Sequence, residues 1–273
     1  MNRLITSIII SLVAMSAMAQ TAAIEVSYLY RHPEQTMRTA EADISNQYIL
    51  LSNGSISKFY SPKTEYIDSI ESTTEGFESF NMFKRICYEK KQQHLIPRVD
   101  GSFYITKSFK NKVIRTYDVA NGTRFKWDEQ LTEIKWDVTD SIKNILGYEC
   151  FMASTEFHGR KWTVWFSPEI PVADGPWKLH GLSGLILEAV CDGAQYHFVA
   201  DGIQYIENPY YKIYSENNWE TVTGNEFWNL RRSCLENPSR NMNFSANTIV
   251  FQGVSYKNYL PKEIVDYIET DYQ

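Results

Sequence analysis

Residues Glu169–Cys191 read EIPVADGPWKLHGLSGLILEAVC, and the rest of the chain is organised around this stretch. Proline fixes φ and withholds a backbone donor, so a segment with several prolines forms neither a regular helix nor a central strand. Frequent glycine marks positive φ or a backbone that approaches another group closely. The prolines and glycines that interrupt it are Pro171, Gly175, Pro176, Gly181 and Gly184, and Pro168 stands directly before it. We therefore expect a shaped loop that leads into a buried strand at LILEAV.

Short apolar runs separated by turn dipeptides make up most of the remaining chain. Asn53-Gly54 lies between YILLS and SISKFYS, and Asn-Gly supplies the positive φ of a tight hairpin turn. Similar dipeptides are Asp100-Gly101, Asn121-Gly122, His158-Gly159, Asp192-Gly193 and Asp201-Gly202. The pattern predicts a mainly β protein of the α+β type, a curved antiparallel meander sheet or incomplete barrel with one or two short helices. Residues Gly147–Ile206 should form consecutive strands of this meander.

Helix signals are few and lie late in the sequence. Thr223 and Glu226 form a capping-box pattern, which predicts a short helix at Asn225–Leu235. A second short helix is expected at Lys262–Ile268, where the apolar residues share one face. Residues Ser72–His94 are ambiguous, because Gly76 argues against a long helix there.

The first 19 residues have the pattern of a secretory signal peptide. Arg3 precedes an apolar run that is too short to span a membrane, and Ala17-Met18-Ala19 resembles a cleavage site. We expect a periplasmic or secreted protein that starts near Gln20 and has no transmembrane span. Residues 20–273 should form a single β-rich domain, with a core at about 48–206 and a helix-containing extension at about 207–273.

The charge and the cysteines restrict the classes of partner and the redox state. The net charge of −6 and the absence of a basic run argue against binding of nucleic acid. The abundance of Tyr, Phe and Trp provides apolar area for a core and favours strands. Four cysteines allow three pairings, and their spacing selects none. Two of them, Cys150 and Cys191, should lie at opposite corners of the sheet without a bridge; the other two are Cys87 and Cys234.

A compound pattern between Tyr48 and Ile206 resembles the GLPGLI family of exported bacterial proteins. Its pieces occur in a fixed order: SKFYS, Asp68-Ser69, WDVTD, GYECFMASTEFHGRKWTVWFSPEIP and GPWKLHGLSGLIL. The sequence departs from the family name at Ser183, where the family has proline. The resemblance implies a location in the envelope of bacteria with an outer membrane, and it brings no established activity.

Catalytic and cofactor motifs are missing at the level of sequence. Ser183 in GLSG lacks the strand–turn–helix context of a nucleophile elbow, because a strand follows it. The five histidines have no metal-ligand spacing, and there is no CxxC, phosphate loop or dinucleotide fingerprint. We therefore expect no catalytic residue, no metal and no cofactor.

The residues of the loop and the preceding strand are the candidates for binding or for holding the loop. They are Arg160, Trp162, Trp165, Glu169, Trp177, His180, Gly181, Ser183 and Gly184. Arg160 has three alternatives: pairing with Glu169, packing on an aromatic face, or bonding loop carbonyls. Trp177 is either a lid over an apolar ligand or a plug of the sheet. We expect Trp177 and Leu182 to be buried beside Arg160.

The geometry of the loop and its strand yields further expectations. Gly181 and Gly184 should both have positive φ, and His180 should lie at the rim. The strand through Trp165 should be covered on both faces, because large apolar groups occur on each. Function then divides into two classes: a non-enzymatic envelope protein that binds an apolar ligand or a partner protein through the sheet and the loop, or a hydrolase whose site forms only in three dimensions. The missing catalytic spacings favour the first.

Overall fold

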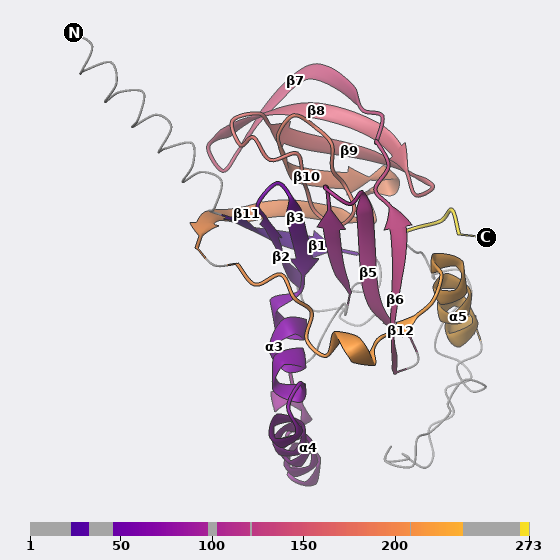
Figure 1. Cartoon of the computed structure of the whole chain (residues 1–273). Coiled ribbons are helices and arrows are strands. Elements are labelled where there is room, and N and C mark those ends of the chain that lie inside the picture. Colours follow the sequence, from indigo (N-terminus) through magenta and orange to yellow (C-terminus); the bar gives the residue numbers. More distant parts are fainter. Residues whose placement is uncertain are drawn as a thin grey trace, which may run out of the picture.

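The computed structural model describes residues 23–32, 46–97, 103–120, 122–207, 209–236 and 268–272. Twelve strands form one sheet in the order β12-β6-β5-β4-β3-β2-β1-β11-β10-β9-β8-β7 (Figure 1). The strands are β1 (Ala23–Arg31), β2 (Asn46–Ser52), β3 (Ile56–Tyr60), β4 (Tyr104–Ser108), β5 (Val113–Ala120), β6 (Thr123–Gln130), β7 (Asp137–Ile145), β8 (Tyr148–Phe157), β9 (Arg160–Ser167), β10 (Leu185–Cys191), β11 (His197–Ile206) and β12 (Glu220–Thr221). The sheet bends strongly but stays open, with β12 and β7 at its edges. The predicted mainly β fold is confirmed.

All neighbouring strands are antiparallel except β12, which pairs parallel to β6. Two meanders, β1 to β6 and β7 to β11, meet where β1 pairs with β11. The predicted meander of residues Gly147–Ile206 is confirmed, because β8, β9, β10 and β11 are successive neighbours.

Most of the predicted turns join strands as expected. Gly54, Gly122, Gly159 and Gly193 have φ between +72° and +78°, the region that glycine enters without steric cost. The interpretation of Asp201-Gly202 as a turn is wrong. This dipeptide lies inside β11, where the register against β1 shifts by one residue, so the same chemistry makes a β-bulge.

Three α-helices lie among the described residues: α3 (Pro62–Glu71), α4 (Thr74–Glu89) and α5 (Gly224–Glu236). Three short 3₁₀ turns accompany them: η1 (Gln93–Leu95), η2 (Asp192–Ala194) and η3 (Glu216–Asn218). The capping box of α5 is confirmed, since Glu226 N donates to Thr223 Oγ1 and Thr223 N donates to Glu226 Oε2. Helix α5 packs on the sheet through Phe227, which stacks on Trp127.

Helices α3 and α4 form an arm that projects from the sheet and does not cover it (Figure 1). The glycine that argued against a long helix lies in the first turn of α4, where Gly76 N donates to the Thr73 cap at 3.1 Å. A glycine in the first turn, beside a side-chain cap, leaves the rest of the helix intact, so a 16-residue helix forms.

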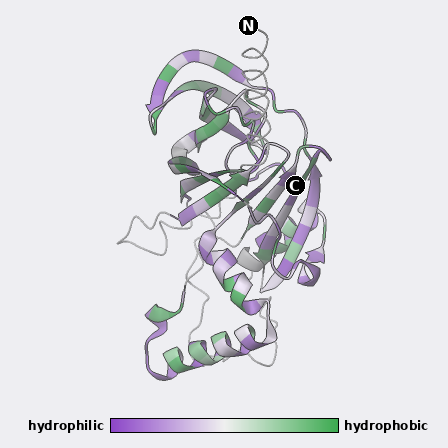
Figure 2. Cartoon of the chain, turned by 60° about the vertical axis from the view of Figure 1, so that its left-hand side comes forward, coloured by the Kyte–Doolittle hydropathy of each residue, from purple (hydrophilic) through white to green (hydrophobic). Residues whose placement is uncertain are grey.

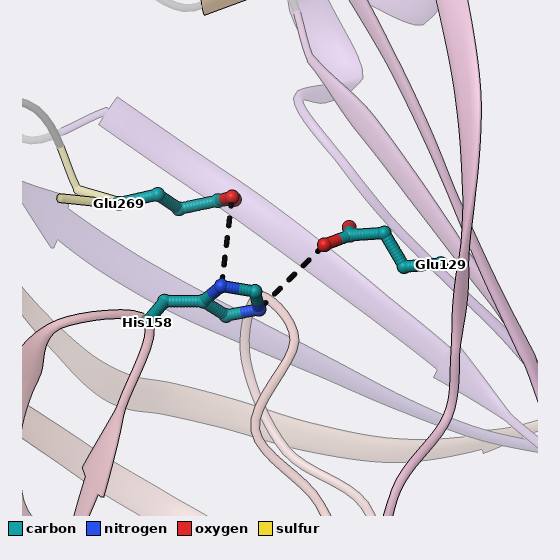
Figure 3. Close-up of side chains that lie close together, drawn as sticks. All are labelled: Glu129, His158 and Glu269. Carbon is teal, nitrogen blue, oxygen red and sulfur yellow. Dashed lines mark ion pairs between the residues drawn. The ribbon is translucent and has the colours of Figure 1, made fainter. Parts of the chain in front are cut away.

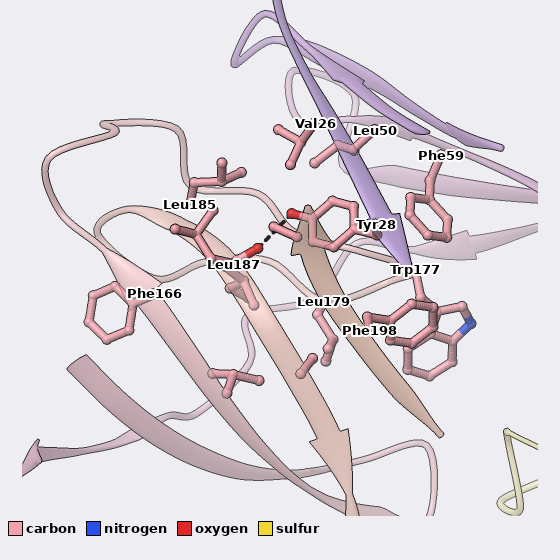
Figure 4. Close-up of a cluster of buried hydrophobic side chains, with 14 of the residues drawn as sticks. Val26, Tyr28, Leu50, Phe59, Phe166, Trp177, Leu179, Leu185, Leu187 and Phe198 are labelled. Atoms are coloured by element: carbon pink, nitrogen blue, oxygen red, sulfur yellow. Dashed lines mark hydrogen bonds between the residues drawn. The ribbon is translucent and has the colours of Figure 1, made fainter. Parts of the chain in front are cut away.

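The main core lies between the bent sheet and residues 168–184, which fold over its concave side (Figure 4). Tyr28 on β1 is fully buried, and its hydroxyl donates to the Ile186 carbonyl at 2.6 Å. Phe198 on β11 stacks on Tyr30 with ring centroids 4.4 Å apart. Each such side chain contributes about 1.5–3 kcal/mol through burial of apolar area.

Several predictions fall outside the described residues. They are the signal peptide at Met1–Ala19, the turn at Asp100-Gly101, residues 262–267 of the C-terminal helix, and the side chain of Cys234. The described thiols, Cys87, Cys150 and Cys191, are free and buried. Cys150 and Cys191 lie at opposite ends of the β8–β9–β10 ladder, as predicted, because Cys150 is at the start of β8 and Cys191 is at the end of β10.

Candidate functional site

The proline- and glycine-rich loop, residues 168–184, is folded inward as predicted. Asp174 and His180 form an isolated antiparallel bridge within it, and Gly181 N donates to the Ala173 carbonyl. Trp177 is 2% exposed, and its indole stacks on Trp162 with centroids 5.3 Å apart. Trp177 is therefore a plug of the sheet and not a lid over a ligand. It holds φ at +54°, a strained value for a bulky residue that the surrounding packing imposes.

Arg160 and Glu169 lie at opposite ends of β9, so the alternative in which these two residues pair is wrong. The Arg160 guanidinium lies over the Tyr196 ring, 4.8 Å from its centroid, which is the aromatic alternative. The Glu169 carboxylate accepts a hydrogen bond from Glu149 N at 2.9 Å. Both side chains hold local structure at their own ends of the strand.

His180 is buried at 3% exposure, so its expected position at the rim is wrong. Its Nδ1 lies 2.8 Å from the Lys178 carbonyl and its Nε2 lies 3.0 Å from the Thr132 carbonyl. Burial, with the nearby charge of Lys107, lowers the pKa of His180 below its ordinary value. A neutral imidazole has only one N–H, so only one of the two carbonyl contacts is a hydrogen bond at neutral pH. The ring is too deeply placed to meet a substrate.

The two glycines that flank Ser183 serve different purposes. Gly181 has the predicted positive φ of +93°. Gly184 does not have positive φ, so the prediction of positive φ at Gly184 is wrong. A Cβ atom added to Gly184 would lie 2.1 Å from the Ser167 carbonyl oxygen. Close approach of two backbones is therefore what requires Gly184. Ser183 itself is exposed, and within the described part of the chain it has no hydrogen bond to a histidine or a carboxylate.

Strand β9 is central but unequally covered on its two faces. Trp162, Val164 and Phe166 are buried on the core face, as predicted. Trp165 on the opposite face is only half-buried, with the Lys143 ammonium 5.3 Å from its ring centroid. The expectation of two fully covered faces is therefore correct for one face only.

A buried ion cluster lies beneath the loop and was missed from the sequence. Lys178 is fully buried, and its ammonium contacts Glu129 Oε2 and lies 2.7 Å from Glu269 Oε1. His158 lies 3.8 Å from each carboxylate (Figure 3). These groups come from β6, the loop, the β8–β9 turn and the segment at 268–272, which the cluster ties together.

The charges in this cluster are shared unequally. Burial lowers the pKa of Lys178, but the attraction of Glu269 and Glu129 outweighs burial and raises it. Burial raises the pKa of Glu129, but the adjacent Lys178 ammonium outweighs this effect and holds it below its ordinary value. Burial dominates at Glu269 and raises its pKa. Both carboxylates therefore stabilise the charged form of Lys178.

Carboxylate and imidazole atoms of Glu129, His158 and Glu269 lie within 4.8 Å of one another, a spacing that a metal ion would accept. The Lys178 ammonium already contacts both carboxylates, and the Tyr272 hydroxyl donates to Glu129. A divalent cation at this position would lie beside a buried positive charge, which is costly at low dielectric. The donor set fits an internal ion pair and does not fit a metal centre.

Residues 268–272 attach to the β8–β9 turn next to the cluster. Thr270 N donates to the His158 carbonyl at 3.0 Å, and Thr270 Oγ1 donates to the Gly159 carbonyl at 3.0 Å. Tyr272 stacks on Trp228 of α5 with ring centroids 6.3 Å apart. The segment therefore connects the turn, the loop and α5.

A second buried ion pair fixes the start of the loop. Lys107 on β4 and Asp174 are both fully buried, with their charged atoms 2.5 Å apart. Lys107 Nζ also donates to the carbonyls of Gly175 and Leu179, and Ser52 Oγ donates to Asp174 at 2.9 Å. Every polar group of this pair is used internally, so it supports the loop and is closed to a ligand.

A cavity of about 150 Å³ lies between α3 and the β5–β6 hairpin. Its lining residues are Thr64, Ile67, Asp68, Glu71, Val119, Arg124 and Trp219. Arg124 Nη2 donates to Asp68 Oδ1 at 2.7 Å and lies 3.5 Å from Glu71 Oε2. The Tyr104 hydroxyl donates to Asp68 Oδ2 at 2.6 Å. The cavity thus combines fixed charged groups with an aromatic wall.

Helix α4 carries several apolar residues, coloured green along the arm in Figure 2. Met82 is 56% exposed, and Phe83 and Ile86 are each 38% exposed. The only buried side chain of α4 is Cys87. We call Met82, Phe83 and Ile86 the α4 patch.

The local sequence carried little signal for these features. Lysine is almost never fully buried, so nothing marked Lys178 or Lys107 as core residues. Asp68 and Arg124 lie 56 residues apart, and only the folded sheet brings them together. The apolar residues of α4 were visible, but the doubt raised by Gly76 obscured the helix that presents them.

Comparisons with known proteins agree with the fold. No curated protein matches the chain. Two solved structures titled "Structure of PNGF-II", in space groups P21 and C2, match with a TM-score of 0.52 and 16% and 15% identity. Each match covers 77% of this chain and 33% of the other. The chain therefore spans about a third of the length of these structures, and at this identity the likeness concerns the fold alone.

A family model described as "N-glycanase peptide, N-terminal domain" matches residues 63–223. This range is more than half of the chain and runs from α3 to the residue before α5. It includes the loop, the cavity and the α4 patch, so all three belong to the shared domain. The chain is a member of the family defined by the N-glycanase peptide N-terminal domain.

Proposed function

We propose that the chain is an exported, non-enzymatic binding module that docks on a partner protein through the α4 patch. The observation that carries this proposal is the exposure of Met82, Phe83 and Ile86 on a helix that projects from the sheet. Three neighbouring apolar side chains at helical spacing are costly to leave in water, and such patches mark interaction surfaces. Aromatic residues and methionine are also enriched at interfaces.

The loop and the concave side of the sheet are poorer candidates for the binding surface. Trp177, Leu179 and Leu182 fill that side with the chain's own apolar groups and are at most 5% exposed. This packing leaves little room for an apolar ligand on the concave side of the sheet, where the sequence predicted binding. We therefore favour a role for the candidate residues in holding the loop in place over a role in ligand binding.

The charges around the α4 patch favour one kind of partner. Lys90 and Lys91 follow the helix, are exposed, and form no ion pair with any residue that the structure describes. A complementary surface would be an apolar groove with acidic groups at the end that receives these lysines. The matching part of the PNGF-II structures is a third of a longer chain, which supports a folded protein as the partner.

The hydrolase alternative has less support. His180 is buried, both carboxylates of the Lys178 cluster already contact the Lys178 ammonium, and Ser183 lacks a neighbouring base among the described residues. Export rests on the signal-peptide pattern at Met1–Ala19, and N-terminal sequencing that finds Gln20 first would support it. None of the described helices is long and apolar enough to cross a membrane. Membership of the GLPGLI family stays a prediction that agrees with an envelope location.

The α4 patch is tested by site-specific photo-crosslinking in the cells that naturally produce the protein. A benzophenone amino acid at position 86 should give one discrete adduct with another protein, and the same group at position 138 should not. Val138 on β7 is the control, because it lies on a different element and is 56% exposed, more than Ile86 at 38%. The double change Met82→Asp and Phe83→Asp should abolish the adduct, whereas Val138→Asp with Ile142→Asp should leave it unchanged.

Two outcomes would overturn this proposal. An adduct of equal intensity from both positions would indicate nonspecific contact. An adduct whose mass is twice that of the chain, together with a dimer in sedimentation, would show that α4 binds a second copy. Thermal unfolding of each variant confirms that the exposed substitutions leave the fold intact.

A further inference from the structure

We infer that the cavity between α3 and the β5–β6 hairpin binds a single pyranose ring of a neutral sugar. The site lies on a face of the domain that the loop and the buried ion clusters do not use. It is separate from the α4 patch, so it adds a small-molecule ligand to the proposed partner-binding role. The inference rests on the size of the cavity, the order of its polar groups and the rigidity of its walls.

The volume fits one six-membered ring. The cavity measures about 150 Å³. An engineered apolar cavity of about the same volume in another protein holds benzene, a six-membered ring. Larger ligands need pockets of roughly 300 Å³ or more. The size therefore selects a monosaccharide unit over an oligomer or an extended lipid.

The polar groups alternate between acceptor and donor along one side. Asp68 and Glu71 supply carboxylate oxygens, and the Arg124 guanidinium lies between them, bonded to the first and 3.5 Å from the second. The Nε and Nη1 groups of Arg124 have no acceptor among the residues that the structure describes. A vicinal diol needs this order, because each hydroxyl donates to a carboxylate and accepts from a neighbouring N–H.

The remaining walls are apolar. Ile67 on α3, Val119 on β5 and Trp219 line the cavity. A pyranose has C–H groups on its faces, so an apolar wall opposite a polar edge matches its two kinds of surface. A simple anion or a metal ion would gain nothing from Ile67 and Val119.

The walls are held in place before any ligand arrives. Asp68 is fixed by the Tyr104 hydroxyl and by Arg124, and it is 6% exposed. Trp219 packs edge-on against Tyr104 and Tyr117, with ring centroids 6.2 and 5.3 Å away. The Arg124 guanidinium lies 5.4 Å from the Trp219 ring centroid. Preorganised groups lose little conformational entropy on binding, which favours affinity for a ligand that matches their geometry.

Ligand-observed NMR and calorimetry with defined glycosides test the inference. The probes are methyl α-mannopyranoside, methyl N-acetyl-β-glucosaminide and, as a cationic alternative, methylguanidinium. At least one glycoside should bind with a Kd of about 1 mM or tighter. Glu71→Gln should weaken binding about tenfold, because it removes the negative charge and replaces one of the two acceptor oxygens with an NH2 donor. Val119→Phe should abolish binding by filling the cavity.

Asp128→Asn is the matched control. Asp128 forms the same type of carboxylate–arginine pair with Arg115 on the outer part of the same hairpin, outside the cavity. This variant should bind the glycoside like the parent, and all three variants should melt as single transitions.

The inference is overturned if neither glycoside binds at about 10 mM, tenfold above the expected Kd. It is also overturned if binding survives both Glu71→Gln and Val119→Phe, or if methylguanidinium binds and the glycosides do not. Loss of the α4 crosslink would leave these results untouched, so failure of the docking proposal and failure of the sugar site are distinguishable.

Discussion

The ammonium of Lys178 lies 2.7 Å from the carboxylate of Glu269, and the two side chains are 0% and 2% exposed. Glu129 completes the pair from β6. Three ionisable groups from distant parts of the chain thus meet beneath the loop. Removal of one charge from such a cluster is costly, because its partners stay buried without compensation.

Lys178→Met should therefore destabilise the protein by about 3–5 kcal/mol. The free energy of unfolding is measured by urea denaturation at neutral pH. The triple change Lys178→Met, Glu129→Gln and Glu269→Gln is the control, and it should recover most of the loss because no uncompensated charge is left. If Lys178→Met alone costs less than about 1 kcal/mol, the cluster is hydrated and contributes little.

Glu188 should contribute to the loss of stability in acid. Its hydrogen bond to His197, with help from Lys143, lowers the pKa of Glu188 below its ordinary value. A carboxylate with a depressed folded-state pKa adds stability that is complete above the unfolded-state pKa and disappears as pH falls through the folded-state value. Glu188→Gln should therefore lose less stability than the parent between about pH 5 and pH 3, as measured by melting temperature. If the melting temperatures of the parent and of Glu188→Gln fall in parallel as the pH decreases, Glu188 does not contribute to the loss of stability in acid.

The glycines of the loop should respond differently to substitution. Gly184→Val should cost more than about 3 kcal/mol, because a Cβ atom would meet the Ser167 carbonyl oxygen at 2.1 Å. Gly181→Ala should cost about 1–2 kcal/mol through its positive φ alone. Thermal melts would rank the two, and a larger loss at Gly181 would refute the close-approach explanation.

Ser183→Pro should be neutral or stabilising by about 0.4–1 kcal/mol. Ser183 is exposed, and a proline restricts the unfolded chain more than the folded loop. The change also restores the residue of the GLPGLI pattern. Urea denaturation measures the effect, and a loss of more than about 1 kcal/mol would mean that the native φ or the Ser183 N–H is incompatible with proline.

The two faces of β9 should tolerate charge unequally. Val164→Asp places a carboxylate at a fully buried position and should cost several kcal/mol. Trp165→Asp loses packing on a half-buried face, but the new carboxylate is near the Lys143 ammonium and partly hydrated. Its cost should be clearly smaller. Equal losses in denaturation experiments would show that the outer face is covered.

Local features of the fold were predictable from the sequence because they depend on neighbouring residues. The turns at Asn53-Gly54 and His158-Gly159 require positive φ, and glycine marks that need directly. The cap of α5 was visible for the same reason, since Thr223 and Glu226 are three residues apart. The bulge at Asp201-Gly202 uses the same dipeptide, and only the partner strand distinguishes a bulge from a turn.

Nonlocal features escaped prediction. His180 was expected at the rim, but the crossing segment at Thr132 and Trp136 covers it, and Trp136 Nε1 donates to its carbonyl at 3.0 Å. No residue near His180 in the sequence indicates that this segment covers its side chain. The same holds for the cavity, where Asp68 on α3 meets Arg124 on β6.

The pairing of β1 with β11 sets the order in which the sheet forms. Each meander closes through hairpins between neighbours, whereas Ser27 and Asp201 meet across 174 residues of chain. Closing a loop of this length costs conformational entropy before any contact between β1 and β11 forms. We therefore expect the β1–β11 pairing to form late and to limit the folding rate. Until then β1 has an unpaired, apolar edge, to which a strand of another chain can pair. We therefore expect the newly made chain to be most prone to aggregation until β11 becomes available.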